Sequence, residues 1–242
     1  MKIAVIGGTG LIGSQVVTDL RAAGHEAVPH SKSTGIDVIS GQGLDDALRG
    51  ADVVVNLTNS PTFDEASPAF FQTSMDNLLA AADRAGVGHF VILSIVGVDR
   101  VPELDYYKAK LLQEQILAAG PVPYSIVRAT QFMDFMDAVL SWTADGDTVR
   151  LPATPIQPIA SKDVARAVAE VAAGAPLNDI RSVAGPEVFT LDELGRITLS
   201  HKGDDRTVVT DPTAGMFAAV KGDVLTDKNA HLAPTRYTDW LS

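Results

Sequence analysis

The chain has 242 residues, of which 46% are hydrophobic and 20% charged, so it can bury a sizeable core and does not belong to the disordered class. Its formal net charge of −11 argues against extended contact with nucleic acid or with an anionic membrane, because both require a basic surface. It has no cysteine, which excludes disulfides, thiolate nucleophiles and cysteine-ligated metals.

Strand-like and helix-like patterns alternate from residue 2 to about residue 128. Short apolar runs typical of buried strands are found at 2–7, 25–31, 51–58, 89–97 and 124–129, with a weaker one at 35–41. Helical spacing is found at 11–24, 43–50, 67–86 and 106–120. The short links between these runs predict βαβ units, and hence an α/β fold with a doubly wound parallel sheet covered on both faces.

The pattern is looser in the last part of the chain. Helices are expected at 131–146, 161–174 and 191–203. Ser161 is the expected N-cap of the second of these helices. Residues 148–160 contain three prolines and are expected to form strand fragments and loop. We expect a single domain over residues 1–242, in which roughly 131–242 contributes a small substrate-side lobe.

The segment "GGTGLIG" follows the first predicted strand and opens the first predicted helix. Gly8, Gly10 and Gly13 fit the GxGxxG dinucleotide fingerprint, and the strand–loop–helix context is the one that this fingerprint requires. Glycines let the chain turn tightly and let the backbone approach a pyrophosphate, which the N–H groups at the start of the helix then bind. A tight turn without a ligand is the alternative. We therefore expect a Rossmann-type sheet and a phosphate loop formed by Gly7, Thr9, Gly10, Leu11, Ile12 and Gly13.

The end of the second predicted strand reads "PHSKST" and carries no acidic residue. An Asp or Glu at this point holds the ribose hydroxyls in NAD sites, and it would repel a 2′-phosphate. Ser31 and Lys32 offer donors to such a phosphate, so we expect NADP(H) to be preferred, with NAD(H) as the second option. The alternative is that Lys32 is an ordinary solvated loop lysine, and that Asp37 contacts the adenosine side or caps a turn.

Several motifs occur together in the order typical of one family. They are "GGTGLIG", "ADVVVNLTNSP", "HFVILSIVGVDR", "YYKAK" and "YSIVRATQF". In these motifs the chain resembles the atypical short-chain dehydrogenase/reductases of the NmrA-like, NAD(P)-binding subgroup, most strongly from Lys2 to about Phe135. The resemblance implies a Rossmann fold, an NAD(P) cofactor and a catalytic Ser, Tyr and Lys, with the Lys four residues after the Tyr.

Tyr106 and Lys110 match the YxxxK pattern of this family, whereas Tyr107 has Leu111 four residues on and is expected to be a packing neighbour. Ser94, at the end of the preceding strand, corresponds to the family's serine. The resemblance implies that Tyr106 exchanges a proton with the substrate, that Lys110 lowers the pKa of the phenol from about 10, and that Ser94 holds the substrate oxygen. The alternatives are an ordinary surface pair on a helix and a strand-end hydroxyl bonded to local backbone.

Other strand ends complete the expected site. Asn56 and Thr58 end the strand before Ser94 and are expected beside the cofactor's ribose. An apolar substrate cavity is expected to be lined by Phe63, Val96, Gln131, Phe132, Phe135 and Met136. Core packing is the alternative for the Phe and Met residues. Arg128 is expected either to contact an anionic group or to pair with an acid.

Together these interpretations predict an NADP(H)-preferring oxidoreductase that exchanges a hydride with a small carbonyl, alcohol or quinone. One alternative is a redox sensor that binds the dinucleotide and regulates a protein partner without turnover, and another is an isomerase or dehydratase with a tightly held cofactor. The histidines show no ligand spacing, so no metal is assigned. We expect a soluble, cytoplasmic protein whose partner is a small-molecule substrate, without direct contact to nucleic acid or membrane; the oligomeric state stays open.

Overall fold

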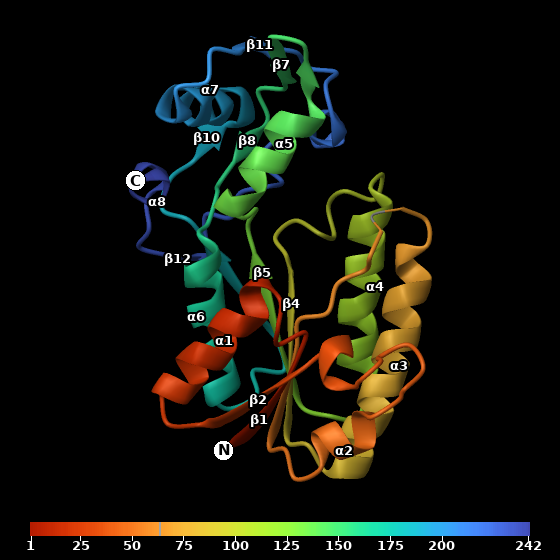
Figure 1. The fold of residues 1–242 in the computed structure, drawn as a ribbon. Coiled ribbons are helices and arrows are strands. Elements are labelled where there is room, and N and C mark those ends of the chain that lie inside the picture. The colour runs from red at the N-terminus through yellow and green to blue at the C-terminus, as the bar shows by residue number, and fades with distance from the viewer. Residues whose placement is uncertain (63) are drawn as a thin grey trace. The chain divides into compact units, whose positions relative to one another are not determined.

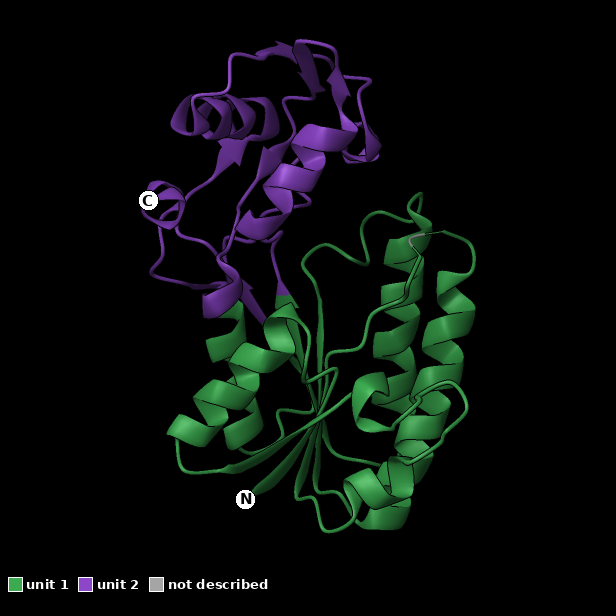
Figure 2. Ribbon diagram, viewed as in Figure 1, with its two compact units in different colours: residues 1–128, 164–181 green, residues 129–163, 182–242 purple. Residues whose placement is uncertain are grey.

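The structure is a computed structural model that describes residues 1–62 and 64–242. It divides into two compact units, which Figure 2 shows in different colours. Unit 1 comprises residues 1–128 and 164–181, and unit 2 comprises residues 129–163 and 182–242. The expected lobe of residues 131–242 thus differs from unit 2 chiefly by residues 164–181, which belong to unit 1.

A central sheet of seven strands has the order β12-β9-β5-β4-β3-β1-β2. The strands are β1 (Lys2–Ile6), β2 (Glu26–His30), β3 (Val53–Asn56), β4 (His89–Ile95), β5 (Tyr124–Ala129), β9 (Ile180–Ala184) and β12 (His231–Leu232). β1 pairs in parallel with β2 on one side and with β3 on the other, so Ile6 lies level with both His30 and Asn56. The chain crosses from one side of β1 to the other between β2 and β3. This is the switch point beyond whose strand ends α/β sheets bind their ligands.

Helices cover both faces of the sheet. They are α1 (Leu11–Ala22), α2 (Leu44–Leu48), α3 (Ser67–Ala85), α4 (Asp105–Ala119) and α6 (Ser161–Ala173). Figure 1 shows α1 and α6 on one face and α2, α3 and α4 on the other. This arrangement confirms the predicted α/β fold with a doubly wound parallel sheet.

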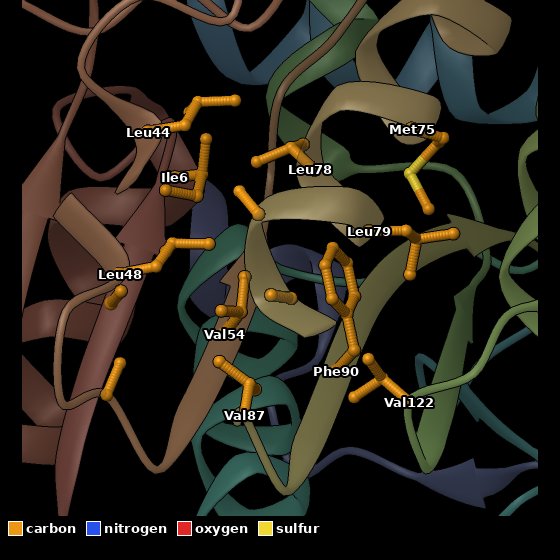
Figure 3. Packing of buried hydrophobic residues seen from close by; sticks show 14 of the residues in the cluster. Ile6, Leu44, Leu48, Val54, Met75, Leu78, Leu79, Val87, Phe90 and Val122 are labelled. Atoms are coloured by element: carbon orange, nitrogen blue, oxygen red, sulfur yellow. The ribbon is translucent and has the colours of Figure 1, made fainter. Parts of the chain in front are cut away.

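One face of the sheet packs on α2 and α3 through a cluster of buried apolar side chains (Figure 3). Ile6, Val54 and Phe90 come from three neighbouring strands and are fully buried. They pack in one cluster with Leu48 of α2 and Leu78 of α3. Burial of a side chain of this size contributes about 1.5–3 kcal/mol, which explains why the central strands are apolar throughout.

The weak strand predicted at residues 35–41 is absent, and that prediction was wrong. The segment is a loop that begins at Gly35 and ends at Gly41, whose φ angles of 92° and 76° do not fit a strand. Ile36 and Val38 are nevertheless buried in the core cluster, with 6% and 7% exposure. The alternating apolar pattern therefore arises from a loop that points two side chains inward.

Unit 2 contains short elements around helices α5 (Met136–Trp142) and α7 (Leu191–Lys202). Its other elements are β6 (Ala144–Asp145), β7 (Thr148–Leu151), β8 (Pro155–Ile156), β10 (Phe189–Thr190), β11 (Thr207–Thr210), α8 (Tyr237–Leu241) and the 3₁₀ helices η2 (Met133–Phe135) and η3 (Met216–Ala219). Ser161 does not act as the expected cap, because it is the first residue of α6 and its hydroxyl donates to Asp134 Oδ1 at 3.0 Å. In the described part of the chain, no helix is both long and apolar enough to cross a membrane.

Candidate functional site

The phosphate loop lies between β1 and α1, and most of its glycines are required by packing. Gly7 has a φ of 78°, and its N–H donates to the His30 carbonyl at 2.8 Å, which ties the loop to the end of β2. A Cβ at Gly8 would lie 2.7 Å from the Val5 carbonyl oxygen, and a Cβ at Gly13 would lie 2.1 Å from the Gly7 carbonyl oxygen. These glycines let the loop fold back against strand and helix.

Gly10 is different, because none of the described residues would block a side chain there. It is exposed, its φ is −79°, and an added Cβ would meet only the Gly7 carbonyl oxygen, at 3.4 Å. Gly10 is the N-cap of α1, and the first turn of this helix carries no acidic residue. The first N–H groups of a helix, here those of Leu11 and Ile12, have no partner within it and lie at the positive end of the helix dipole. Such a cradle fits a pyrophosphate, which is the group that the sequence predicted.

The predicted 2′-phosphate site follows β2 directly. Lys32 opens the 3₁₀ helix η1 (Lys32–Thr34), its side chain is 79% exposed, and its Nζ lies 3.8 Å from Asp37 Oδ2. An exposed ion pair of this length is worth about 0–1 kcal/mol, so it leaves Lys32 able to bind another anion. The Ser31 hydroxyl bonds the Ser33 hydroxyl at 2.7 Å. Asp37 thus serves the loop locally: its Oδ1 also accepts the N–H of Ile39 at 2.8 Å.

Asn56 has a structural part in shaping the next strand end. Its side chain is 1% exposed, and its Oδ1 accepts both the N–H of Thr58 (3.0 Å) and the hydroxyl of Thr58 (2.7 Å). Its Nδ2 contacts Met75 Sδ at 3.4 Å. Asn56 was predicted to lie beside the cofactor; here its polar atoms bind the protein, and half-buried Thr58 is the more accessible of the two.

The two adjacent tyrosines lie in different surroundings at the start of α4. Tyr107 is a buried packing residue with 5% exposure. Tyr106 is half-buried, and its hydroxyl donates to Asn59 Oδ1 at 2.6 Å. Burial raises the pKa of Tyr106 to about 12, against a smaller opposing effect of the bond to Asn59. The phenol of Tyr106 therefore keeps its proton at neutral pH in the ligand-free protein.

Lys110 lies one turn after Tyr106, but its amine donates hydrogen bonds to other residues. Its Nζ donates to the Leu93 carbonyl oxygen at 2.7 Å and to Gln113 Oε1 at 2.5 Å, and it lies 5.0 Å from the centre of the Phe71 ring. Burial lowers the pKa of Lys110 to about 7, although the nearby Glu114 acts to raise it.

The expected lowering of the Tyr106 pKa by Lys110 is thus absent from the structure. The sequence interpretation had the ammonium lowering the pKa of the phenol, whereas the pKa of Tyr106 is raised. The physical reason is burial. The Lys110 amine is buried against the Leu93 carbonyl of β4, and because burial disfavours the charged form its own pKa falls. The Phe71 ring connects the two residues, because its centre is 6.4 Å from that of Tyr106 and 5.0 Å from Lys110 Nζ.

Ser94 offers an unused donor near the end of β4. It is 4% exposed, and its Oγ has no hydrogen-bond partner among the residues that the structure describes. The local backbone bond, which was the alternative for Ser94, is therefore not formed. A buried hydroxyl without a partner costs free energy, and such groups are found where a ligand supplies the missing bond.

Arg128 pairs with an acid, which was one of its two predicted roles. Its Nε and Nη2 donate to Glu114 Oε1 and Oε2 at 2.9 and 2.6 Å, and its Nη1 donates to Asp99 Oδ1 at 3.2 Å. These bonds connect α4 to β5 and leave little of the guanidinium for a substrate anion.

The predicted apolar cavity residues that the structure describes are distributed over both units. Val96 is buried in unit 1, and Phe63 lies outside the described residues. In unit 2, a cavity of about 10 Å³ has walls that include Gln131, Phe132, Phe135 and Met136, and this volume holds no more than a water molecule. A larger hollow of about 120 Å³ in the same unit is bounded by Trp142 and Met216, among others. Across the described residues, no three His, Asp or Glu side chains gather as a metal site would require.

Sequence reasoning missed three residues of this site: Asn59, Phe71 and Gln113. Asn59 follows Thr58 in the same polar loop, so its place after β3 was a usable signal, but nothing in its spacing indicated a bond to Tyr106. Gln113 lies three residues after Lys110 on α4, and nothing in the sequence distinguished it from the other polar residues of that helix. Phe71 lies in the helix predicted at 67–86, where nothing distinguished it from the other apolar residues, and it is fully buried.

Solved structures of other proteins share this fold. A nucleoside-diphosphate-sugar epimerase from Staphylococcus aureus superposes with a TM-score of 0.75 at 16% identity, over 100% of this chain and 99% of that one. A dTDP-4-dehydrorhamnose reductase from Bacillus anthracis, in complex with NADP, gives a TM-score of 0.71 at 15% identity, over 88% of this chain and 85% of that one. At these identities the likeness concerns the fold alone.

Three curated proteins are similar in sequence. A (4-alkanoyl-5-oxo-2,5-dihydrofuran-3-yl)methyl phosphate reductase of Streptomyces griseus is 31% identical over 79% of this chain and 70% of its own length. A chloroplastic divinyl chlorophyllide a 8-vinyl-reductase of Cucumis sativus is 26% identical over 90% of this chain, and the photosystem II assembly factor Ycf39 of Synechocystis is 27% identical over 55%. The matches span 61% and 45% of the length of these last two proteins.

A family model described as NAD(P)H-binding matches residues 7–174, from the first glycine of the phosphate loop to the end of α6. The match includes the phosphate loop, the ends of β2 and β3 that follow it, and the turn of α4 from Tyr106 to Lys110. The chain therefore belongs to this NAD(P)H-binding family.

Proposed function

We propose that the protein is an NADP(H)-dependent oxidoreductase that reduces a small carbonyl compound or quinone, with oxidation of the corresponding alcohol as its reverse reaction. The observation that carries the proposal is the presence, within unit 1, of an open glycine cradle at the start of α1 and a protonated phenol at the start of α4. The motifs around both features support the finer assignment to the NmrA-like subgroup of atypical short-chain dehydrogenase/reductases, and a cytoplasmic small-molecule enzyme is the setting that we propose.

In this proposal the nicotinamide of the bound cofactor supplies the hydride, and the chain handles the oxygen and the proton. The unpartnered Ser94 hydroxyl donates to the substrate oxygen, and the Tyr106 hydroxyl gives its proton to the same oxygen. Lys110 positions β4, because its bond to the Leu93 carbonyl fixes the residue that precedes Ser94. The phosphate groups bind at Gly10 and the first N–H groups of α1.

The pKa of Tyr106 favours reduction at neutral pH. A phenol with a pKa of about 12 is almost fully protonated there and can donate, whereas oxidation of an alcohol requires the phenol to be ionised first. Two of the similar proteins are named as reductases, which supports this direction. We expect the oxidative rate to rise steeply with pH and the reductive rate to depend on it less.

The activity is tested by following the consumption of NADPH and of NADH by the purified protein over a panel of aldehydes, ketones, quinones and α,β-unsaturated carbonyl compounds. We expect turnover with at least one class, at a higher kcat/KM for NADPH. Failure to consume either cofactor with any member of the panel would contradict the proposal.

The preference for NADP(H) rests on Lys32, and it is tested by calorimetric titration. We expect NADP(H) to bind more tightly than NAD(H), and Lys32→Ala to weaken NADP(H) by about tenfold while leaving NAD(H) nearly unchanged, since only the former carries the 2′-phosphate. Lys228→Ala, at an exposed lysine of unit 2, is the matched control and should change neither affinity. Equal affinities for the two cofactors in the wild type would remove this part of the proposal.

The second candidate is a dinucleotide-binding regulator without turnover. Its specific support is that Lys110 does not lower the pKa of Tyr106, together with the similarity to an assembly factor. A protein that binds NADPH tightly, yet consumes none with any compound of the panel, would favour this candidate over the reductase.

A further inference from the structure

The Tyr106 hydroxyl donates a hydrogen bond to a carbonyl oxygen of the protein itself. Its proton points to Asn59 Oδ1 at 2.6 Å, the oxygen of a side-chain amide. A carbonyl substrate presents an oxygen of the same kind and must receive its proton from the same hydroxyl. Because a hydroxyl has a single proton to donate, Asn59 and the substrate oxygen compete for it.

The loop that carries Asn59 is held in place by its own side chains. The Asn59 oxygen also accepts the N–H of Ser60 at 3.0 Å, which fixes the orientation of the amide. Ser60 is buried, and its Oγ accepts from the N–H of Thr62 (3.3 Å) and lies 3.2 Å from the hydroxyl oxygen of Ser67 at the start of α3. The Ser67 hydroxyl in turn reaches the Thr62 carbonyl at 2.7 Å. Asn59 is therefore presented to Tyr106 by a fixed turn.

We propose that Asn59 is a specificity-determining positioning residue that occupies the donor of Tyr106 until a substrate oxygen replaces it. The inference rests on the proposed reductase function, and it adds what a substrate must do: present an oxygen that accepts from Tyr106 better than the Asn59 amide does. The unpartnered Ser94 hydroxyl favours the exchange, because it offers the incoming oxygen a second bond that Asn59 does not take. Compounds without such an oxygen leave the Tyr106–Asn59 bond in place.

The size of the effect follows from the fraction of protein in which Tyr106 is free. A competing internal bond lowers the apparent affinity by that fraction, so its removal should strengthen substrate binding by about threefold to tenfold, the range expected for one net hydrogen bond. The effect appears in KM and leaves the chemical step nearly unchanged. A carboxylate at the same position holds the phenol more strongly, because charge-assisted hydrogen bonds are about twice as strong as neutral ones.

The first experiment compares Asn59→Ala and Asn59→Asp with the wild type in steady-state turnover of a carbonyl compound from the panel. We expect KM to fall about threefold to tenfold in Asn59→Ala and to rise in Asn59→Asp, with kcat of Asn59→Ala within about twofold of wild type. Asn229→Ala, at an exposed asparagine of unit 2, is the matched control and should change neither constant. A lower kcat in Asn59→Ala with an unchanged KM would overturn the inference, since it would mean that Asn59 supports the active orientation of Tyr106.

The second experiment needs no turnover. The side-chain amide signals of Asn59 are followed by NMR in protein saturated with NADP⁺, which cannot reduce the probe, while the ketones and quinones of the panel are added. We expect these signals to shift on addition of a carbonyl probe, and to be shifted already in Tyr106→Phe without any probe. If none of the probes shifts these signals, the inference is overturned even in an active reductase. A shift without turnover would uphold the inference and contradict the reductase function instead.

Discussion

At the scale of single residues, Gly10 and Gly13 show two different reasons for a glycine in the same loop. A side chain at Gly13 would collide with the Gly7 carbonyl oxygen at 2.1 Å, so this glycine is required for the loop to close. A side chain at Gly10 would meet the same oxygen at 3.4 Å, which is ordinary contact. The space in front of Gly10 therefore has no function in folding, and it fits the close approach of a phosphate.

We predict that Gly10→Ala folds like the wild type but binds NADPH at least tenfold more weakly, because its methyl group occupies the space of the pyrophosphate. Gly13→Ala carries the same methyl group and is the matched comparison; it should lose several kcal/mol of the free energy of unfolding, since backbone atoms must move. Calorimetric titration and urea unfolding of both variants measure the two effects. NADPH affinity in Gly10→Ala equal to that of the wild type would mean that the loop is only a turn.

Single residues were predictable where one local rule decided their place. Tyr106 and Tyr107 were told apart by the lysine four residues after the first, and Tyr107 is indeed buried. The partner of Tyr106 was not predictable, because Asn59 lies 47 residues away and meets it only through the packing of α4 beside the loop after β3. The direction of the Lys110 side chain was missed for a similar reason: the sequence does not show that its amine reaches the Leu93 carbonyl.

At the scale of elements, α4 is a helix that buries polar side chains. Lys110, Gln113 and Glu114 are at most 5% exposed, in positions where an ordinary helix places apolar residues. Each is satisfied by another element: Lys110 by the Leu93 carbonyl of β4, Gln113 by Met75 of α3, and Glu114 by Arg128 of β5. The helix is thereby fixed to both strands beside the site, which holds Tyr106 in position.

Lys110 should make stability depend on pH in a defined direction. Below a pH of about 7 its amine is charged in both folded and unfolded protein, whereas between about 7 and 10.5 only the unfolded chain holds the proton. The contribution of Lys110 to the free energy of unfolding should therefore increase as pH rises, by roughly 2–3 kcal/mol from about pH 7 to about pH 9. We predict this increase for the wild type relative to Lys110→Met.

Urea unfolding at both pH values measures the difference between the wild type and Lys110→Met. Lys108→Met is the control, because Lys108 lies on the same helix with a side chain that is 53% exposed and paired with Asp105. Its stability relative to the wild type should not change with pH. A difference between wild type and Lys110→Met that is flat with pH would show that the amine stays charged when buried.

Most long elements were predictable from the sequence, although β9, with five residues, was missed. The helices and longer strands of unit 1 each carry a full period of apolar residues, and their order alone indicated the parallel sheet. β10 and β12 have two residues each, too few to show any alternation, and neither was recognised as a strand, whereas the equally short β8 lies within the strand fragments expected at 148–160. The loop at residues 35–41 shows the converse error, since two buried side chains in a glycine-flanked turn imitate a strand.

At the scale of the whole molecule, the residues of the candidate site belong to one of the two units. The phosphate cradle, the ends of β2, β3 and β4, and the start of α4 all belong to unit 1, which also holds most of the residues that match the family model. The chain passes between the units near residues 129, 164 and 182, and this division is not visible in a linear pattern. The boundary of the C-terminal lobe could therefore be predicted only approximately from the sequence.

The central claim is that this chain uses Tyr106 to donate a proton in an NADPH-dependent reduction, and the most direct test is the rate of NADPH consumption by Tyr106→Phe. The variant loses only the phenolic hydroxyl, so we predict unchanged NADPH affinity and a loss of turnover by a factor of about 10² to 10⁴. Tyr107→Phe, which removes the same atom from the buried neighbour, should lose far less. A Tyr106→Phe variant that consumes NADPH as fast as the wild type would contradict the account.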